Sequence, residues 1–339
     1  MSTLFVKESL LKAFFHQTRH KPAGKPEVMM LEKIVNVNGV DIAYQLHGNN
    51  QNPTIMLIHG VGYPLTAWPK AMIEQFVDLG FQVLLFDNRD VGRSGNFEHL
   101  SLPNLVWVML KLKLGFSIKV PYQLEDMMLD TVALLDILKL KKVHLVGASM
   151  GGMIAQLLTI HHPERVNSLT SIMSTTGNKT LPKMSDTIRK NLMSKPISDS
   201  DKHMLDFHIK RWQVIGSLDY PAELSNLTEY VKSILERGIT DNGTLRQWLA
   251  IMAAGNREEY LAKVNTPSLI IHGEADEYVP VECGKATAMA IPLAKLKVYA
   301  SMGHDFPNEL IPNIVQEIVD HVIEKEEVLT KEDIKTRWQ

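Results

Sequence analysis

Short apolar runs recur along the chain at a spacing that suits a layered fold. Unlike half-buried strands, they show little polar alternation, which predicts strands buried on both faces of a parallel sheet covered by helices. The runs are TIMLIHG (54–60), FQVLLFD (81–87), VHLVGAS (143–149), SLTSIMS (168–174), SLIIHGE (268–274) and KLKVYAS (295–301). Ahead of them, residues 31–47 carry an Asn-Gly pair between two alternating runs, which predicts a β-hairpin.

Helical patterns fill the intervals between these runs. The clearest are residues 67–80, 124–140, 150–162, 281–290 and 311–327. Alternation of strand and helix predicts an α/β fold, in which a doubly wound, mostly parallel sheet is connected by right-handed crossovers.

One interval breaks the alternation. Residues 177–254 contain no run typical of a buried strand, and instead carry helical segments rich in Met and Trp, such as DKHMLDFHIKRWQVIG. We interpret this interval as a helical cap inserted into an α/β core formed by residues 26–176 and 255–330. Residues 1–25 are interpreted as an N-terminal extension, a small accessory helix that packs on the body or on a partner.

The composition is that of an ordinary globular protein. The 339 residues are 45% hydrophobic and 22% charged, with a formal net charge of −2, so no broad electrostatic attraction to nucleic acid is expected. No uncharged apolar run approaches about 18 residues, so no membrane-spanning helix is expected. The single cysteine, Cys283, is interpreted as a small core residue of a helix. A lone cysteine and a poor signal peptide together predict a cytoplasmic protein.

Candidate chemistry begins at the end of VHLVGAS. The stretch Gly147-Ala148-Ser149-Met150-Gly151 matches G-x-S-x-G, follows a predicted buried strand and opens a predicted helix. That context is typical of a nucleophile elbow, a strained turn that exposes a serine hydroxyl. Taken alone, the motif also fits a plain strand-to-helix turn.

A serine hydroxyl needs a base within reach, and the base needs an orienting acid. His304 and Asp276 each follow a predicted strand, and the carboxyl ends of parallel strands are where open α/β sheets build their sites. The order Ser149, Asp276, His304 is that of the triad in this type of fold. Glu274 and Asp305 are the alternative acids.

The remaining histidines near these motifs are interpreted as structural. His144 and His272 lie inside predicted strands, where a core or hydrogen-bonded role is expected. His161 and His162 end a predicted helix, where a polar or cationic side chain costs little.

An early loop completes the candidate site. The HGVG segment (59–62) lies between a predicted strand and a predicted helix, and its glycines let the backbone approach a reacting carbonyl. The expected oxyanion donors are the backbone amides of Met150, directly after the serine, and of Val61. In isolation, this segment also fits a simple turn. No H-x-E or paired Cys/His pattern supports a metal site, and the expected chemistry needs no cofactor.

Five motifs, in this order and spacing, resemble those of the α/β-hydrolase superfamily: HGVG, FDNRDVGRSG, LVGASMGG, HGEADEYVP and MGHDFP. The resemblance runs from about residue 31 to 325. FDNRDVGRSG followed by PYQLEDMMLD (121–130) is similar to a subset of esterases resembling aclacinomycin methylesterase. The resemblance implies Ser149 as nucleophile, His304 as base and Asp276 as acid, with Val61 and Met150 as oxyanion donors. It also implies a helical cap after SLTSIMS.

The resemblance extends to a loop that we interpret as structural. Asp87, Arg89 and Ser94 match the family pattern D-x-R-G-x-G-x-S, with one departure. Asp90-Val91 stands where the family has its usual Gly-x step.

These features predict a serine hydrolase that cleaves carboxylic esters of small to medium apolar substrates through an acyl-enzyme. The cap and the apolar segment 102–116 are expected to wall the acyl pocket, or else to form ordinary packing between cap and body. The same triad also fits a cofactor-free perhydrolase or haloperoxidase, a C–C hydrolase, a lactonase or an aminopeptidase. Relatives with an aspartate nucleophile are disfavoured, because position 149 is serine.

A non-catalytic ligand-binding protein on this fold is the remaining alternative, although such a protein has no need of an intact triad. The expected partner is a small-molecule ester. A homodimer is compatible with the sequence.

Overall fold

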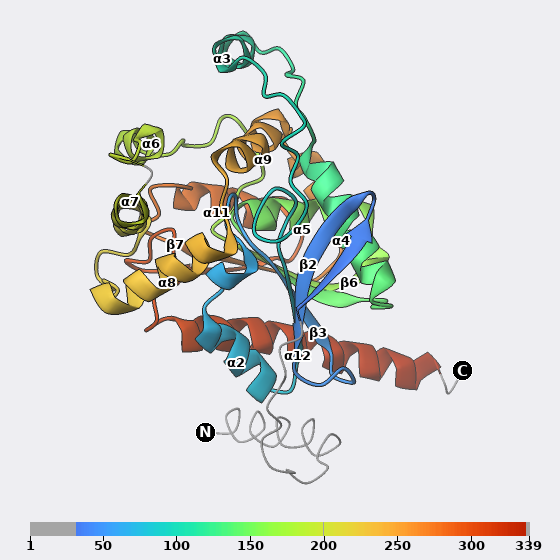
Figure 1. Ribbon diagram of the computed structural model, residues 1–339. Coiled ribbons are helices and arrows are strands. Elements are labelled where there is room, and N and C mark those ends of the chain that lie inside the picture. Colours follow the sequence, from blue (N-terminus) through green and yellow to red (C-terminus); the bar gives the residue numbers. More distant parts are fainter. Residues whose placement is uncertain (1–31, 199, 337–339) are drawn as a thin grey trace.

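A mixed sheet forms the centre of the molecule (Figure 1). The computed structural model describes residues 32–198 and 200–336, and within them the sheet has eight strands in the order β1-β2-β4-β3-β5-β6-β7-β8. β1 and β2, and β2 and β4, pair antiparallel, while all other neighbours pair parallel. In chain order the strands are β1 (Lys33–Val37), β2 (Val40–His47), β3 (Thr54–Ile58), β4 (Gln82–Phe86), β5 (Val143–Ala148), β6 (Val166–Ile172), β7 (Ser268–Gly273) and β8 (Lys295–Tyr299).

The predicted hairpin and all six apolar runs are strands of this sheet, so the predicted α/β fold class is confirmed. The hairpin turns at Asn38 and Gly39, whose φ angles of 51° and 81° are those of a two-residue type I′ turn. Every residue of β3 and β4 is buried, as expected for strands covered on both faces. β8 is the exception, because it lies at the edge of the sheet and exposes its first residues.

Helices cover both faces of the sheet (Figure 1). α2 and α12 pack with one face, and α4 and α5 with the other, so two separate apolar layers form the core. Outside the interval 177–254 the helices are α2 (Lys70–Asp78), α3 (Leu105–Lys113), α4 (Leu124–Ile137), α5 (Met150–His161), α10 (Glu258–Leu261), α11 (Val281–Ala290) and α12 (Ile311–Thr336). The short 3-10 helices are η1 (Leu65–Ala67) and η2 (Pro163–Arg165).

Four helices, here called the cap helices, fill the interval between β6 and β7. They are α6 (Asp186–Met193), α7 (Asp201–Ile215), α8 (Leu224–Arg237) and α9 (Asp241–Ala253). Ser185, Ser200 and Thr240 begin three of them, each accepting a backbone hydrogen bond at the helix N-terminus. The division into a core (26–176 and 255–330) and a cap (177–254) stays a prediction. The predicted extension, residues 1–25, lies outside the described residues.

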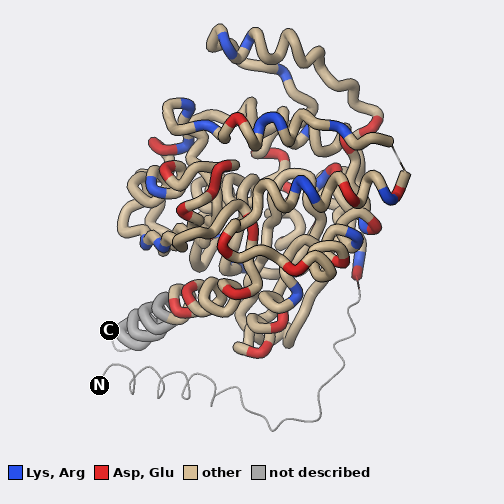
Figure 2. Tube along the Cα trace, turned by 90° about the vertical axis from the view of Figure 1, so that its left-hand side faces the viewer, with Lys and Arg blue, Asp and Glu red and all other residues tan. Residues whose placement is uncertain are grey.

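α3 stands apart from the rest of the molecule. In Figures 1 and 2 it lies at the top, at the end of an arm that leaves the body between β4 and α4. Across the described part of the chain, no helix combines the length and the apolar character that crossing a bilayer requires.

Candidate active site

Ser149 occupies a strained turn between β5 and α5. Its φ of 55° and ψ of −119° place it in a region that side chains other than glycine rarely adopt. A Cβ on Gly151 would overlap the backbone carbonyl of Ile58, and a Cβ on Gly147 would overlap the carbonyl of Gly151. The glycines on either side are therefore required for α5 to start so close to β3. The sequence motif thus folds as a strand, a sharp turn and a helix.

The structure brings the three predicted triad residues together. Ser149 Oγ lies 3.1 Å from His304 Nε2, and His304 Nδ1 lies 2.7 Å from Asp276 Oδ2. All three side chains are buried. The ring of Tyr278 stacks on that of His304 at 4.5 Å between centroids, which restricts the imidazole to the plane it needs for both contacts.

Asp276 is held as a carboxylate. Its Oδ1 accepts hydrogen bonds from the amides of Tyr278 and Val279, which leaves Oδ2 for His304. Burial alone would raise the pKa of Asp276, but the charge of His304 and hydrogen bonds from His272 and His304 outweigh burial and lower the pKa to about 2. This group therefore stays ionised through the neutral range.

The two alternative acids lie elsewhere. Glu274 is exposed to solvent. Asp305 accepts a hydrogen bond from the amide of Ser217 at 3.2 Å, so it ties the His304 loop to the end of α7. Among the described residues, Asp276 is the carboxylate hydrogen-bonded to His304.

The predicted oxyanion loop lies directly against the serine. A Cβ on Gly60 would lie 3.1 Å from Ser149 Cβ, and Val61 lines the same pocket as the serine. The loop is held from the cap side, because the amide of Gly62 donates to Gln247 Oε1 at 2.7 Å. The roles of Val61 and Met150 as oxyanion donors stay predictions. Sequence reasoning missed Gln247, since nothing local marks its partner 185 residues away.

A pocket of about 970 Å³, counted with open solvent at its mouth, contains Ser149 and His304. Its walls combine the HGVG loop with the cap helices and the segments that follow them. The main apolar wall residues are Val61, Met173, Leu192, Trp212, Ile215, Ile239, Trp248 and Phe306. The expectation that segment 102–116 walls the pocket is wrong. Residues 102–116 do not line it, because α3 is carried away from the body.

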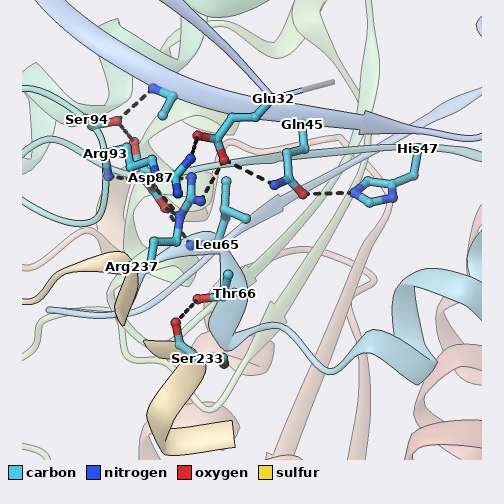
Figure 3. A network of polar contacts seen from close by, with 11 residues as sticks. Glu32, Gln45, His47, Leu65, Thr66, Asp87, Arg93, Ser94, Ser233 and Arg237 are labelled. Atoms are coloured by element: carbon cyan, nitrogen blue, oxygen red, sulfur yellow. Dashed lines mark hydrogen bonds and ion pairs between the residues drawn. The ribbon is translucent and has the colours of Figure 1, made fainter. Parts of the chain in front are cut away.

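The loop after β4 fixes the cap on the core through buried charge. Asp87 accepts hydrogen bonds from the amides of Leu65 and Arg93 and from Arg237 Nε, at 2.7, 2.8 and 2.9 Å (Figure 3). Arg237, at the end of α8, also donates to Glu32 at 2.6 Å. Burial would lower the pKa of Arg237, but its bonds to Asp87 and Glu32 outweigh burial and raise it.

Asp90 makes the second such link. Both of its carboxylate oxygens accept hydrogen bonds from Arg246 of α9 at 2.8 Å, and Tyr122 donates to it at 2.7 Å. Arg246 is only 1% exposed. Asp90 keeps a left-handed backbone, with φ of 70°, where the family pattern has glycine. The departure noted in the sequence therefore supplies the carboxylate that binds the cap, and that departure was the signal that could have revealed the link.

A serine at a nucleophile elbow, facing a histidine and an aspartate on a mostly parallel α/β sheet, is the architecture of the α/β hydrolases. The chain belongs to this family, since the family described as "alpha/beta hydrolase fold" matches residues 53–307. It is accordingly a hydrolase.

Named relatives include enzymes of two kinds. The rhodomycin D methylesterase of Streptomyces peucetius is 22% identical over 279 residues, covering 77% of this chain and 87% of the relative. A 2-hydroxy-6-oxononadienedioate/2-hydroxy-6-oxononatrienedioate hydrolase of Cupriavidus pinatubonensis is 25% identical over 287 residues, covering 80% and 88%. The crystal structure of an esterase from a Rhodococcus species superposes with a TM-score of 0.65 at 17% identity, covering 86% of this chain and 98% of the other.

Removing one partner of the Asp90–Arg246 pair should destabilise the protein strongly. Arg246→Met leaves the Asp90 carboxylate buried without its cation, so we expect a loss of about 3–5 kcal/mol in the free energy of unfolding. The double variant Asp90→Asn/Arg246→Met removes both charges and should recover part of that loss. Urea unfolding of the wild type, the two single variants and the double variant measures it. If the double variant is as unstable as the sum of the two single variants, the direct pairing is contradicted.

His59 should make stability depend on pH. Burial lowers the pKa of His59 to about 3, although the backbone of Ala67 acts to raise it. Below pH 6.5 the unfolded chain therefore binds a proton that the folded protein excludes, and stability falls as the pH falls. At pH 5 this loss amounts to roughly 2 kcal/mol. His59→Gln should remove that part of the loss between pH 7.5 and 5, whereas His99→Gln, at an exposed site, should not. Parallel losses in all three proteins would exclude His59 as the cause.

Proposed function

We propose that this protein is a serine hydrolase that cleaves carboxylic esters of small to medium apolar substrates. The observation that carries the proposal is the hydrogen-bonded line from Ser149 through His304 to Asp276, which faces a pocket beside the HGVG loop. The methylesterases among its relatives support the same reaction class.

The geometry suits a two-step acyl transfer. His304 Nε2 takes the proton of Ser149 as Oγ attacks the ester carbonyl, and Asp276 keeps the other ring nitrogen protonated and stabilises the imidazolium. The backbone amides of Val61 and Met150 stabilise the tetrahedral oxyanion. The alcohol leaves with the proton held by His304. Water then attacks the acyl-enzyme with His304 again acting as base, which releases the acid and regenerates Ser149.

The pocket walls support an apolar substrate. Aromatic and aliphatic side chains from the cap side surround the serine, as in pockets that bind apolar small molecules. The cap links through Arg237 and Arg246 keep these walls at a defined distance from Ser149.

A second candidate reaction is C–C bond hydrolysis of a carboxylate-bearing substrate. Arg211 lines the pocket, and no carboxylate in the described part of the chain pairs with its guanidinium, which donates instead to the carbonyl of Leu192. A substrate carboxylate would supply that missing charge. The C–C hydrolases among the relatives carry dicarboxylate names.

The proposal predicts that Ser149→Ala abolishes ester hydrolysis. We expect the wild type to hydrolyse p-nitrophenyl esters within the series from acetate to laurate, and the variant to lose at least about 10³-fold in kcat. Ser225→Ala, at an exposed serine, serves as the matched control. The chain length that gives the highest kcat/KM measures the acyl pocket.

Two outcomes of this assay would redirect the proposal. Equal activity of wild type and Ser149→Ala would exclude Ser149 as the nucleophile. A wild type that labels with a fluorophosphonate at Ser149 but hydrolyses no ester of the series would favour the C–C reaction over the ester reaction. In that case the released products of a carboxylated diketone substrate are the next measurement.

The acid can be tested against its neighbour. Asp276→Asn keeps the size of the side chain but removes the charge that fixes the His304 tautomer, so kcat should fall by about 10³-fold or more. Glu274→Gln lies two residues away at an exposed position and should leave kcat unchanged. The opposite result would assign the acid to Glu274.

A further inference from the structure

The arm formed by residues 101–120 exposes an unusual amount of apolar surface. Val108 is the one buried residue in it. Val106 is 78% exposed, Trp107 62% and Phe116 63%, and the exposed apolar side chains also include Leu105, Met109, Leu110 and Leu114. A contiguous group of apolar side chains on a solvent-exposed surface marks an interaction site.

Local hydrogen bonds define both ends of the helix in the arm. The Asn104 side chain accepts hydrogen bonds from the amides of Val106 and Trp107 and so caps the N-terminus of α3. At the other end Gly115, with φ of 79°, ends the helix, and the amide of Phe116 bonds back to the carbonyl of Lys111. Both ends are therefore satisfied while the apolar side chains stay in solvent.

The distribution of these side chains selects the kind of partner. At about 100° per residue, positions 105, 106, 107, 109 and 110 cover roughly 200° of the helix circumference. A second copy of this chain packed against α3 would cover only one stripe of the helix, about 100° of its circumference. A lipid interface, by contrast, contacts every side of a helix that projects into it.

The charge of the arm matches an anionic surface. Residues 101–120 contain Lys111, Lys113 and Lys119 and no Asp or Glu, although the whole chain has a net charge of −2. The charged positions near the outer end of the arm in Figure 2 are lysines. Tryptophan and exposed lysines at the end of an apolar helix are typical of segments that lie at the headgroup level of a membrane.

We propose that the arm docks this protein on the surface of an anionic lipid bilayer, with α3 lying in the interface and Lys111, Lys113 and Lys119 contacting lipid phosphates. In Figure 1 the arm lies on the same side of the body as α6 and α9, which line the pocket, and opposite α2 and α12. Docking therefore turns the cap side of the pocket toward the lipid.

The test is binding of the full-length chain to vesicles of phosphatidylcholine, with and without phosphatidylserine, measured by co-sedimentation. We expect the wild type to bind the anionic vesicles more tightly than the neutral ones, and Trp107→Glu/Leu110→Glu to bind them at least tenfold more weakly. Lys111→Gln/Lys113→Gln should lose about tenfold or more on anionic vesicles alone. Met289→Glu/Leu293→Glu alters two apolar side chains that are even more exposed, one in α11 and one just after it, and should bind as the wild type does.

A second measurement uses a conservative change. Brominated lipid should quench part of the tryptophan fluorescence of the wild type, and Trp107→Phe should remove that quenching. The proposal is overturned if the wild type binds neither kind of vesicle, if the arm variants bind as tightly as the wild type, or if Trp107→Phe leaves the quenching unchanged. It is also overturned if, without lipid, the wild type sediments as a dimer and Trp107→Glu/Leu110→Glu as a monomer, because the arm is then a contact between copies.

Discussion

Buried charged side chains in one loop hold the parts of this molecule together. Within four residues after β4, Asp87, Arg89 and Asp90 bind groups from η1, α4, α8 and α9. Charges at this depth are costly to desolvate, and they are tolerated only where every partner is present in good geometry. Such pairs therefore act mainly by selecting one placement of the helices over others. Any other placement of α8 or α9 on the core would leave a charge buried alone.

The placement of α9 also shapes the site. Gln247 follows Arg246 directly, and its amide group bridges the carbonyl of Arg89 and the amide of Gly62. The Asp90–Arg246 pair that positions α9 thus also positions the backbone of the HGVG loop beside Ser149. The cap helices are in this sense part of the framework of the pocket. A substitution that moves α9 is expected to alter the HGVG loop beside Ser149 through the Gln247 side chain.

Local signals account for what could be predicted from the sequence. The hairpin, the apolar strands and the elbow are each encoded within about ten residues, and the meeting of strand ends at one edge of the sheet allowed Asp276 and His304 to be named. Ion pairs between residues distant in sequence could not be predicted, because a charged side chain does not specify its counterpart. Arg237 and Asp87, for example, are 150 residues apart. The sequence favoured Asp276 over Glu274, and the path of the loop agrees with that choice, because Glu274 is exposed whereas Asp276 is hydrogen-bonded to His304. Segment 102–116 was misplaced because apolar composition is the same for a helix buried in a core and for one exposed on an arm.

The strands of the sheet come from two separate parts of the chain, and this affects how the protein is made. Strands β1 to β6 and the elbow precede the cap, whereas β7, β8 and α12 follow it. A ribosome therefore adds Ser149 before it reaches the cap helices, and adds Asp276 and His304 only after them. While the ribosome adds residues 150–303, the nascent polypeptide carries the proposed nucleophile without its proposed base. The proposed triad therefore cannot assemble until β7 and β8 have joined the sheet, and the order of synthesis itself delays its chemistry.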